Sequence, residues 1–145
     1  MLSSLLTAGL LMGLCVTIHA GGLMVALRWL NRRPAPDGAR FWPATGRLIG
    51  IAAWSILLHL IQITVWAIFY VWSQGMPDLS SALYFSAVTY TTTGYGDVVL
   101  PEGWRLVGGV EALTGILMCG LSTGLFFAAF GKLVAGSSGN QPGRA

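Results

Sequence analysis

The stretch Thr91-Thr92-Thr93-Gly94-Tyr95-Gly96-Asp97 (TTTGYGD) carries two glycines one residue apart and lies between two long apolar runs. The residues before it, 79–91, are uncharged and too few to cross a bilayer, which takes roughly 20 residues, but they can form a re-entrant helix. Asp78 or Ser80 is a candidate N-cap for that helix. The chain after such a helix must climb back out, and it is tolerated at membrane depth only if it is buried in protein or lines a water-filled path.

Three apolar runs, at Leu5–Leu30, Leu48–Trp72 and Trp104–Lys132, are each long enough to span a membrane. Hydrophobic residues make up 54% of the 145 residues and charged residues only 9%, whereas soluble domains carry about 25% charge. The first run is longer than the apolar part of a signal peptide and has no basic residue before it, so we expect it to be retained. The composition predicts an all-α membrane protein.

Basic residues predict the orientation of these helices. Arginines gather in or beside the polar segment 31–47, which is therefore expected to be cytoplasmic. They are Arg28, Arg32, Arg33, Arg40 and Arg47. This orientation places the N-terminus outside the cell membrane, the stretch 91–97 near the outer side and the C-terminus in the cytoplasm.

The glycines of the stretch have a chemical meaning. An ion that leaves water needs oxygens to replace its hydration shell, and consecutive backbone carbonyls that point the same way can supply them. That arrangement needs unusual dihedral angles at alternating positions, which glycine adopts without a Cβ penalty. Gly94 and Gly96 stand at the spacing that this requires.

TTTGYGD between two apolar helices resembles the signature of the potassium-channel pore family, in particular the small bacterial channels with a two-helix pore unit. The resemblance covers residues 48–132 and implies a homotetramer around one selectivity filter. It implies K⁺ coordination by backbone carbonyls and by the Thr92 hydroxyl. The filter residues that it implies are Thr92, Thr93, Gly94, Tyr95 and Gly96, with K⁺ bound at the first four.

The resemblance also assigns residues that support the filter. Tyr84 and Phe85 stand where the family places aromatic side chains in a cuff around Tyr95, and Asp97 follows the filter. Val88 stands where some members have a glutamate that pairs with this aspartate, so that pair is absent here. Thr93 occupies a position that often holds valine or isoleucine, and little change is expected from it.

The expected organisation follows from these runs. An N-terminal helix (1–30) and a cytoplasmic linker (31–47) precede a pore domain (48–132), and a flexible tail (133–145) follows. The pore domain is expected to contain a helix at 48–72, a pore helix at 79–91, the filter at 92–97 and an inner helix at 104–132. The first helix is additional to the two-helix unit and is expected on the outside of the assembly or against a partner.

Glu111 is an acid within the third apolar run, and such groups are usually paired or functional. One hypothesis is that it bonds to the pore helix near Thr89 or Tyr90 and braces the filter. The alternative is a structural acid that is protonated or linked to Arg105.

His19 and His59 are expected at similar depth, because their helices are antiparallel and each lies about eleven residues from the cytoplasmic end. They could touch and sense pH. The alternative is that each bonds separately, to backbone or to Gln62. A ring separation above about 8 Å would exclude the pairing.

Glycines of the inner helix allow close helix packing, and Gly115 or Gly120 is a candidate gating hinge because inner helices of the resembled family bend at a glycine. No cofactor, nucleic acid or small-molecule ligand is indicated, and K⁺ is expected only as the permeant ion. No enzyme is expected, since no nucleophile–base pair or metal cluster stands out. A non-selective cation channel and a non-conducting scaffold with the same pore fold stay open as alternatives.

Overall fold

The computed structural model describes residues 2–32 and 41–138, and every regular element in that part of the chain is helical. Three of the helices are long and apolar enough to cross a membrane. The expected all-α membrane architecture is therefore confirmed. In chain order the elements are α1 (Leu2–Arg32), α2 (Phe41–Trp72), α3 (Leu79–Tyr90), the 3₁₀ turn η1 (Glu102–Trp104) and α4 (Arg105–Ser138).

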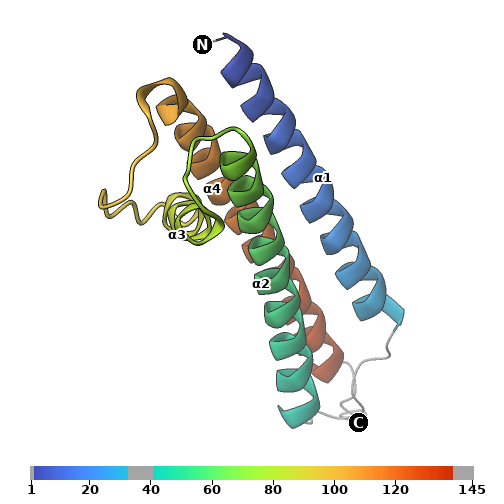
Figure 1. The fold of residues 1–145 in the computed structure, drawn as a ribbon. Helices are drawn as coiled ribbons and strands as arrows, with labels where there is room; N and C mark the ends of the chain where they lie inside the picture. Colours follow the sequence, from blue (N-terminus) through green and yellow to red (C-terminus); the bar gives the residue numbers. More distant parts are fainter. Residues whose placement is uncertain (1, 33–40, 139–145) are drawn as a thin grey trace, which may run out of the picture.

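The three long helices lie side by side, and α1 packs against both α2 and α4 (Figure 1). The short α3 packs on α2 and α4 at the end where α2 finishes and α4 begins. The chain leaves α3 through an extended segment and returns to α4 by way of η1 (Figure 1). This is the re-entrant path that the short apolar segment predicted.

The helix bounds differ from the expected ones at the end opposite α3. Helix α2 begins at Phe41 rather than Leu48, so residues 41–47 are helical rather than linker. Pro43 does not prevent this because it lies in the first turn, where backbone N–H groups have no intrahelical acceptor. Helix α4 runs to Ser138, beyond the expected end at 132. Helix α1 runs to Arg32, and linker residues 33–40, which include Arg33 and Arg40, and tail residues 139–145 lie outside the described residues.

Helix α3 begins at the predicted cap. The Asp78 carboxylate accepts hydrogen bonds from the Ser81 backbone N–H at 2.9 Å and from the Ser81 hydroxyl at 2.8 Å. Such a cap satisfies a donor that the first turn leaves free. The same bonds hold the pKa of Asp78 below its ordinary value. Asp78 is therefore ionised at neutral pH and defines where α3 begins.

Aromatic side chains form the core around α3. Tyr70 of α2 contacts Phe85 of α3 edge to face, with ring centroids 5.3 Å apart, and it also packs against Trp66 and Phe69. A smaller apolar cluster joins α1, α2 and α4 at their other end, and it includes Ile51. The position of α3 is thus determined by packing on α2 and α4 within one chain.

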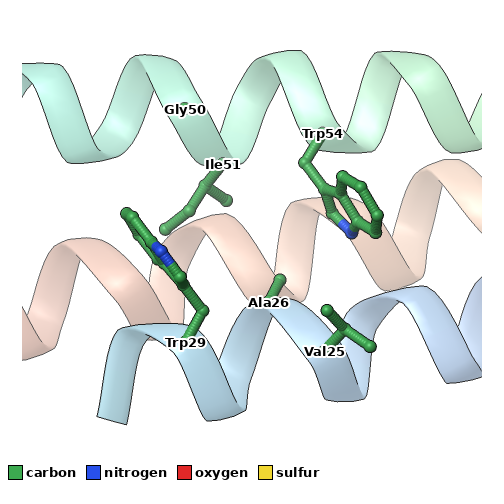
Figure 2. Close-up of a pocket in the computed structure, with 6 residues that line it drawn as sticks. All are labelled: Val25, Ala26, Trp29, Gly50, Ile51 and Trp54. Carbon is green, nitrogen blue, oxygen red and sulfur yellow. The ribbon is translucent and has the colours of Figure 1, made fainter. Parts of the chain in front are cut away.

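An apolar pocket of about 240 Å³ lies between α1 and α2 at the end away from α3. Figure 2 shows the Trp29 and Trp54 indoles at its two sides and Ile51 between them. The Trp54 indole N–H donates to the Gly22 carbonyl at 2.9 Å and so joins the two helices. The lining is almost wholly apolar, so the pocket offers no set of ion ligands.

Candidate ion pathway

The C-terminal end of α3 holds the first residues of the stretch 92–97. The backbone N–H groups of Thr91, Thr92 and Gly94 donate to the carbonyls of Ala87, Thr89 and Val88, at 3.1, 2.9 and 3.1 Å. These bonds satisfy carbonyls that the last turn of a helix leaves without partners. The inner end of the stretch is therefore anchored to α3 by its own backbone.

The backbone of the stretch alternates in φ. Thr92, Gly94 and Gly96 have φ of 61°, 53° and 79°, whereas Thr93 and Tyr95 are not in the positive-φ region. Alternation between left- and right-handed conformations turns successive carbonyls toward one side, while a strand points them to opposite sides. Positive φ is uncommon for a β-branched residue and costs of order 1–3 kcal/mol, so Thr92 keeps it only where the surroundings impose it.

Two threonine hydroxyls tie the stretch to α3. The Thr91 hydroxyl donates to the Ala87 carbonyl at 2.7 Å, and it lies 3.0 Å from the Thr93 hydroxyl. Since the Thr91 hydroxyl hydrogen bonds to the Ala87 carbonyl, the Thr93 hydroxyl donates to the Thr91 hydroxyl oxygen. The valine or isoleucine common at this position in the resembled family could not form this bond.

Tyr84 holds the outer end of the stretch. Its hydroxyl donates to an Asp97 carboxylate oxygen at 2.7 Å, and the other oxygen accepts from the Val98 N–H at 3.1 Å. The Tyr84 bond holds the pKa of Asp97 below its ordinary value. Asp97 therefore has a hydrogen-bond partner on α3 although Val88 cannot supply one.

The expected aromatic cuff is not formed within one chain. Tyr95 is 72% exposed, Tyr84 is bonded to Asp97, and Phe85 is buried against Tyr70. Phe85 packs into the core beneath α3, while Tyr84, the residue before it, faces Asp97.

Glu111 joins α4 to both neighbouring helices. It is fully buried, the Tyr70 hydroxyl donates to one carboxyl oxygen at 2.7 Å, and the other oxygen is hydrogen-bonded to the Ser86 hydroxyl. Ser86 also donates to the Ile63 carbonyl at 2.9 Å. A hydroxyl has one hydrogen and a backbone carbonyl can only accept. The Ser86 hydroxyl thus lies between two acceptors, and a protonated Glu111 would supply the second hydrogen that its contacts with Ile63 and Glu111 require.

The partner expected for Glu111 was wrong by one helical turn. Ser86, rather than Thr89 or Tyr90, reaches the carboxyl group. Arg105 instead pairs with Glu102 on the surface, at 3.9 Å. Residue spacing predicts the depth of Glu111 but not the rotation of α3 about its axis, and that rotation determines which side chain faces it. Tyr70 and Ser86 were missed for the same reason.

A protein-family model described as an ion channel matches residues 48–132, more than half of the chain. The chain belongs to this ion channel family. Neither curated proteins nor solved structures gave a match. The matched segment holds most of α2, all of α3, the stretch 92–97 and most of α4, while α1 lies outside it.

Gly115 of the channel is a packing position. A Cβ placed there would lie 1.8 Å from the Tyr90 carbonyl oxygen, so only glycine allows α4 to come this close to the end of α3. A Cβ placed at Gly120 would have nothing within 4 Å, and α4 continues unbroken through both residues. The helix is not interrupted at either glycine.

Five polar side chains form a closed ring of hydrogen bonds between the helices of one chain. The His19 and His59 ring centroids are 5.0 Å apart, well within the limit set for a pair, and both Nε2 atoms contact the Ser122 hydroxyl, at 3.0 and 3.1 Å. The Tyr90 hydroxyl contacts His59 Nδ1 at 3.0 Å and donates to Gln62 at 2.8 Å. The Gln62 amide lies 2.7 Å from His19 Nδ1 and closes the ring. The pairing of the two histidines is therefore not excluded, and the expected bond to Gln62 is made by His19.

Proposed function

We propose that this channel is selective for K⁺ and conducts it passively through a carbonyl filter at Thr92–Gly96, contributed by four copies of the chain. The observation that carries the proposal is the alternation of φ at Thr92, Gly94 and Gly96. This alternation supports a row of carbonyls that face one side and could replace the hydration shell of an ion. The anchored ends of the stretch, at Thr91 and Asp97, support the same interpretation.

Exposure of the stretch supports the assembly. Every residue from Thr91 to Gly96 is exposed in the single chain, and Tyr95 has no core around it. A dehydrated ion needs oxygens on all sides, whereas one chain supplies one row. Neighbouring copies would supply the other rows and would cover Tyr95. The cuff expected around Tyr95 from Tyr84 would then form between chains.

Orientation and ligands follow from the same geometry. Arg28, Arg32 and Arg47 lie at the end of the bundle opposite the stretch 92–97, so we place that end in the cytoplasm and the filter near the outer face of the cell membrane. The N-terminus is then outside and the C-terminus inside. K⁺ is the proposed permeant ion, and no catalytic step or bound cofactor is proposed.

The test is ion flux into liposomes that contain the purified protein, with K⁺ and Na⁺ compared. Gly94→Ala is the informative variant because φ there is 53° with open space around it, so the substitution strains the backbone without a clash. Gly13→Ala in α1 is the matched control, since nothing lies within 4 Å and α1 is regular helix. We expect K⁺ flux far above Na⁺ flux, lost in Gly94→Ala and kept in Gly13→Ala.

Other outcomes would change the proposal in defined ways. Equal K⁺ and Na⁺ fluxes would identify a non-selective cation channel. Absence of flux at every pH and voltage would favour a non-conducting subunit that keeps the pore fold. K⁺ flux that survives Gly94→Ala unchanged would place the filter elsewhere.

A further inference from the structure

Five side chains from all four α-helices form the polar ring, and it lies at membrane depth. His19 comes from α1, His59 and Gln62 from α2, Tyr90 from α3 and Ser122 from α4. His19, Gln62 and Tyr90 are at most 1% exposed, and the other two are partly buried. Tyr90 is the last residue of α3 and stands two positions before the proposed filter.

The hydrogens in this ring have one consistent direction when both histidines are neutral. Gln62 accepts from Tyr90 through its oxygen, so its NH₂ group faces His19 Nδ1. His19 must then carry its hydrogen on Nε2 and donate to Ser122. Tyr90 uses its own hydrogen on Gln62, so His59 Nδ1 donates to Tyr90, and His59 Nε2 accepts from Ser122. Each member donates once and accepts once around the ring.

One added proton breaks this arrangement. A proton on His19 Nδ1 would face the Gln62 NH₂ group. If the Gln62 amide turned, its NH₂ would face the Tyr90 hydroxyl, which already accepts from His59, and the Tyr90 hydrogen would lose its acceptor. A proton on His59 Nε2 would face the Ser122 hydrogen, and Ser122 would have to turn away. A buried donor without an acceptor is costly, so the proton is accepted only as the ring opens.

Few other ionisable groups surround the ring in the described part of the chain. Cys15 of α1 and Cys119 and Glu111 of α4 are those that interact electrostatically with Tyr90, and His19 interacts with His59. Glu111 is engaged by the Tyr70 and Ser86 hydroxyls and is not hydrogen-bonded to any member of the ring. A second proton is disfavoured because the two imidazole rings are 5.0 Å apart.

We propose that the ring is a proton-binding site within the membrane, and that one bound proton lowers conduction by releasing Tyr90 at the inner end of the filter. The regulatory half of this inference rests on the proposed channel function, whereas the site itself does not. The site also gives α1 a role: His19 closes the ring, so the helix outside the matched family segment determines whether the proton is accepted. Acidification therefore weakens the link between α1 and the filter.

The first measurement uses the full-length protein in liposomes with ¹⁵N-labelled histidine, because the chain contains only two histidines. Solid-state NMR at pH 8 should show His19 with its hydrogen on Nε2 and His59 with its hydrogen on Nδ1. Acidification to about pH 4 should protonate one ring of the pair, because the unsatisfied donor moves the transition below the ordinary imidazole range, about pH 6.5. Two histidines with the same tautomer, or two that protonate independently, would overturn the site.

The second measurement is K⁺ flux across the same pH range. Flux should fall several-fold with the midpoint seen by NMR, and His19→Gln/His59→Gln, which keeps donors and acceptors but cannot titrate, should conduct without pH dependence. Glu111→Gln is the matched control and should keep the pH dependence. Constant flux in the wild type while the NMR signals titrate, or pH dependence that persists in the double variant, would overturn the regulation. Absence of flux at every pH would overturn the proposed function and its regulation. The histidine tautomers seen by NMR would still test the proton-binding site.

Discussion

The stretch 92–97 and the five-residue polar ring are built in opposite ways, although Tyr90 of the ring stands only two residues before the stretch. The stretch is made of backbone, is exposed along its length and holds three residues at positive φ. The ring is made of side chains, three of its members are buried, and five hydrogen bonds join all five members. The strain and exposure of the stretch in one chain agree with the proposed assembly of several copies, whereas the ring is complete within one chain.

Tyr90 connects the two regions. Its hydroxyl belongs to the ring, and its carbonyl oxygen faces Gly115 of α4 two residues before the stretch 92–97 begins. A change that displaces Tyr90 should therefore disturb both regions, while changes on either side of it should affect one region and spare the other.

Gly115→Ala should have the largest effect because it acts on both regions. The new methyl would overlap the Tyr90 carbonyl, and a backbone atom cannot move aside as a side-chain end can. We expect a loss of thermal stability of about 1–3 kcal/mol or more, the usual range for overpacking, together with loss of flux. Gly120→Ala, with nothing within 4 Å, should keep its stability. Equal stability of the two variants in thermal unfolding would disprove the close contact.

Glu111 substitutions should weaken the contacts of α4 with Tyr70 and Ser86 and leave the polar ring intact. Glu111→Gln can still donate to Ser86 and accept from Tyr70, as a neutral acid does, so its stability should change little. Glu111→Ala leaves the Tyr70 hydroxyl without an acceptor, at a cost of about 1–3 kcal/mol for a buried unsatisfied group, while Ser86 keeps its bond to the Ile63 carbonyl. The free energy of unfolding in detergent measures the difference. A Gln variant as unstable as the Ala variant would mean that Glu111 is ionised.

Tyr84→Phe should have the smallest effect, confined to the outer end of the stretch. Without the Tyr84 hydroxyl the pKa of Asp97 should rise toward its ordinary value. Because the pKa of Asp97 is lowered in the folded chain, the bond stabilises the fold at pH values above the ordinary pKa of 3.8. This stabilisation is lost as the pH falls through the folded-state pKa. The variant should therefore lose stability less steeply with acid. Carboxyl NMR titration of Asp97 gives the pKa directly, and an unchanged value would show that the bond does not persist in solution.

Local properties of the sequence were enough to predict the membrane class, the three spanning helices, the re-entrant segment and the location of the stretch 92–97. Each of these depends on composition, run length or glycine spacing, which can be read without knowing how the helices pack. Counting residues also placed His19 and His59 at one depth, because depth follows from the rise along a helix. The start of α2 was misplaced because a proline was read as linker although the first turn of a helix tolerates it.

Which side chains meet depends on the packing of the helices in three dimensions. Ser86 rather than Thr89 reaches Glu111, Tyr84 bonds Asp97 while Phe85 turns into the core, and Gly115 rather than Gly120 touches Tyr90. In each case the choice depends on the rotation of one helix about its axis against another. That rotation is set by packing over the whole interface, and a single residue spacing does not contain it. The direction of the hydrogens in the polar ring follows from the same packing, since it brings five side chains from four helices together.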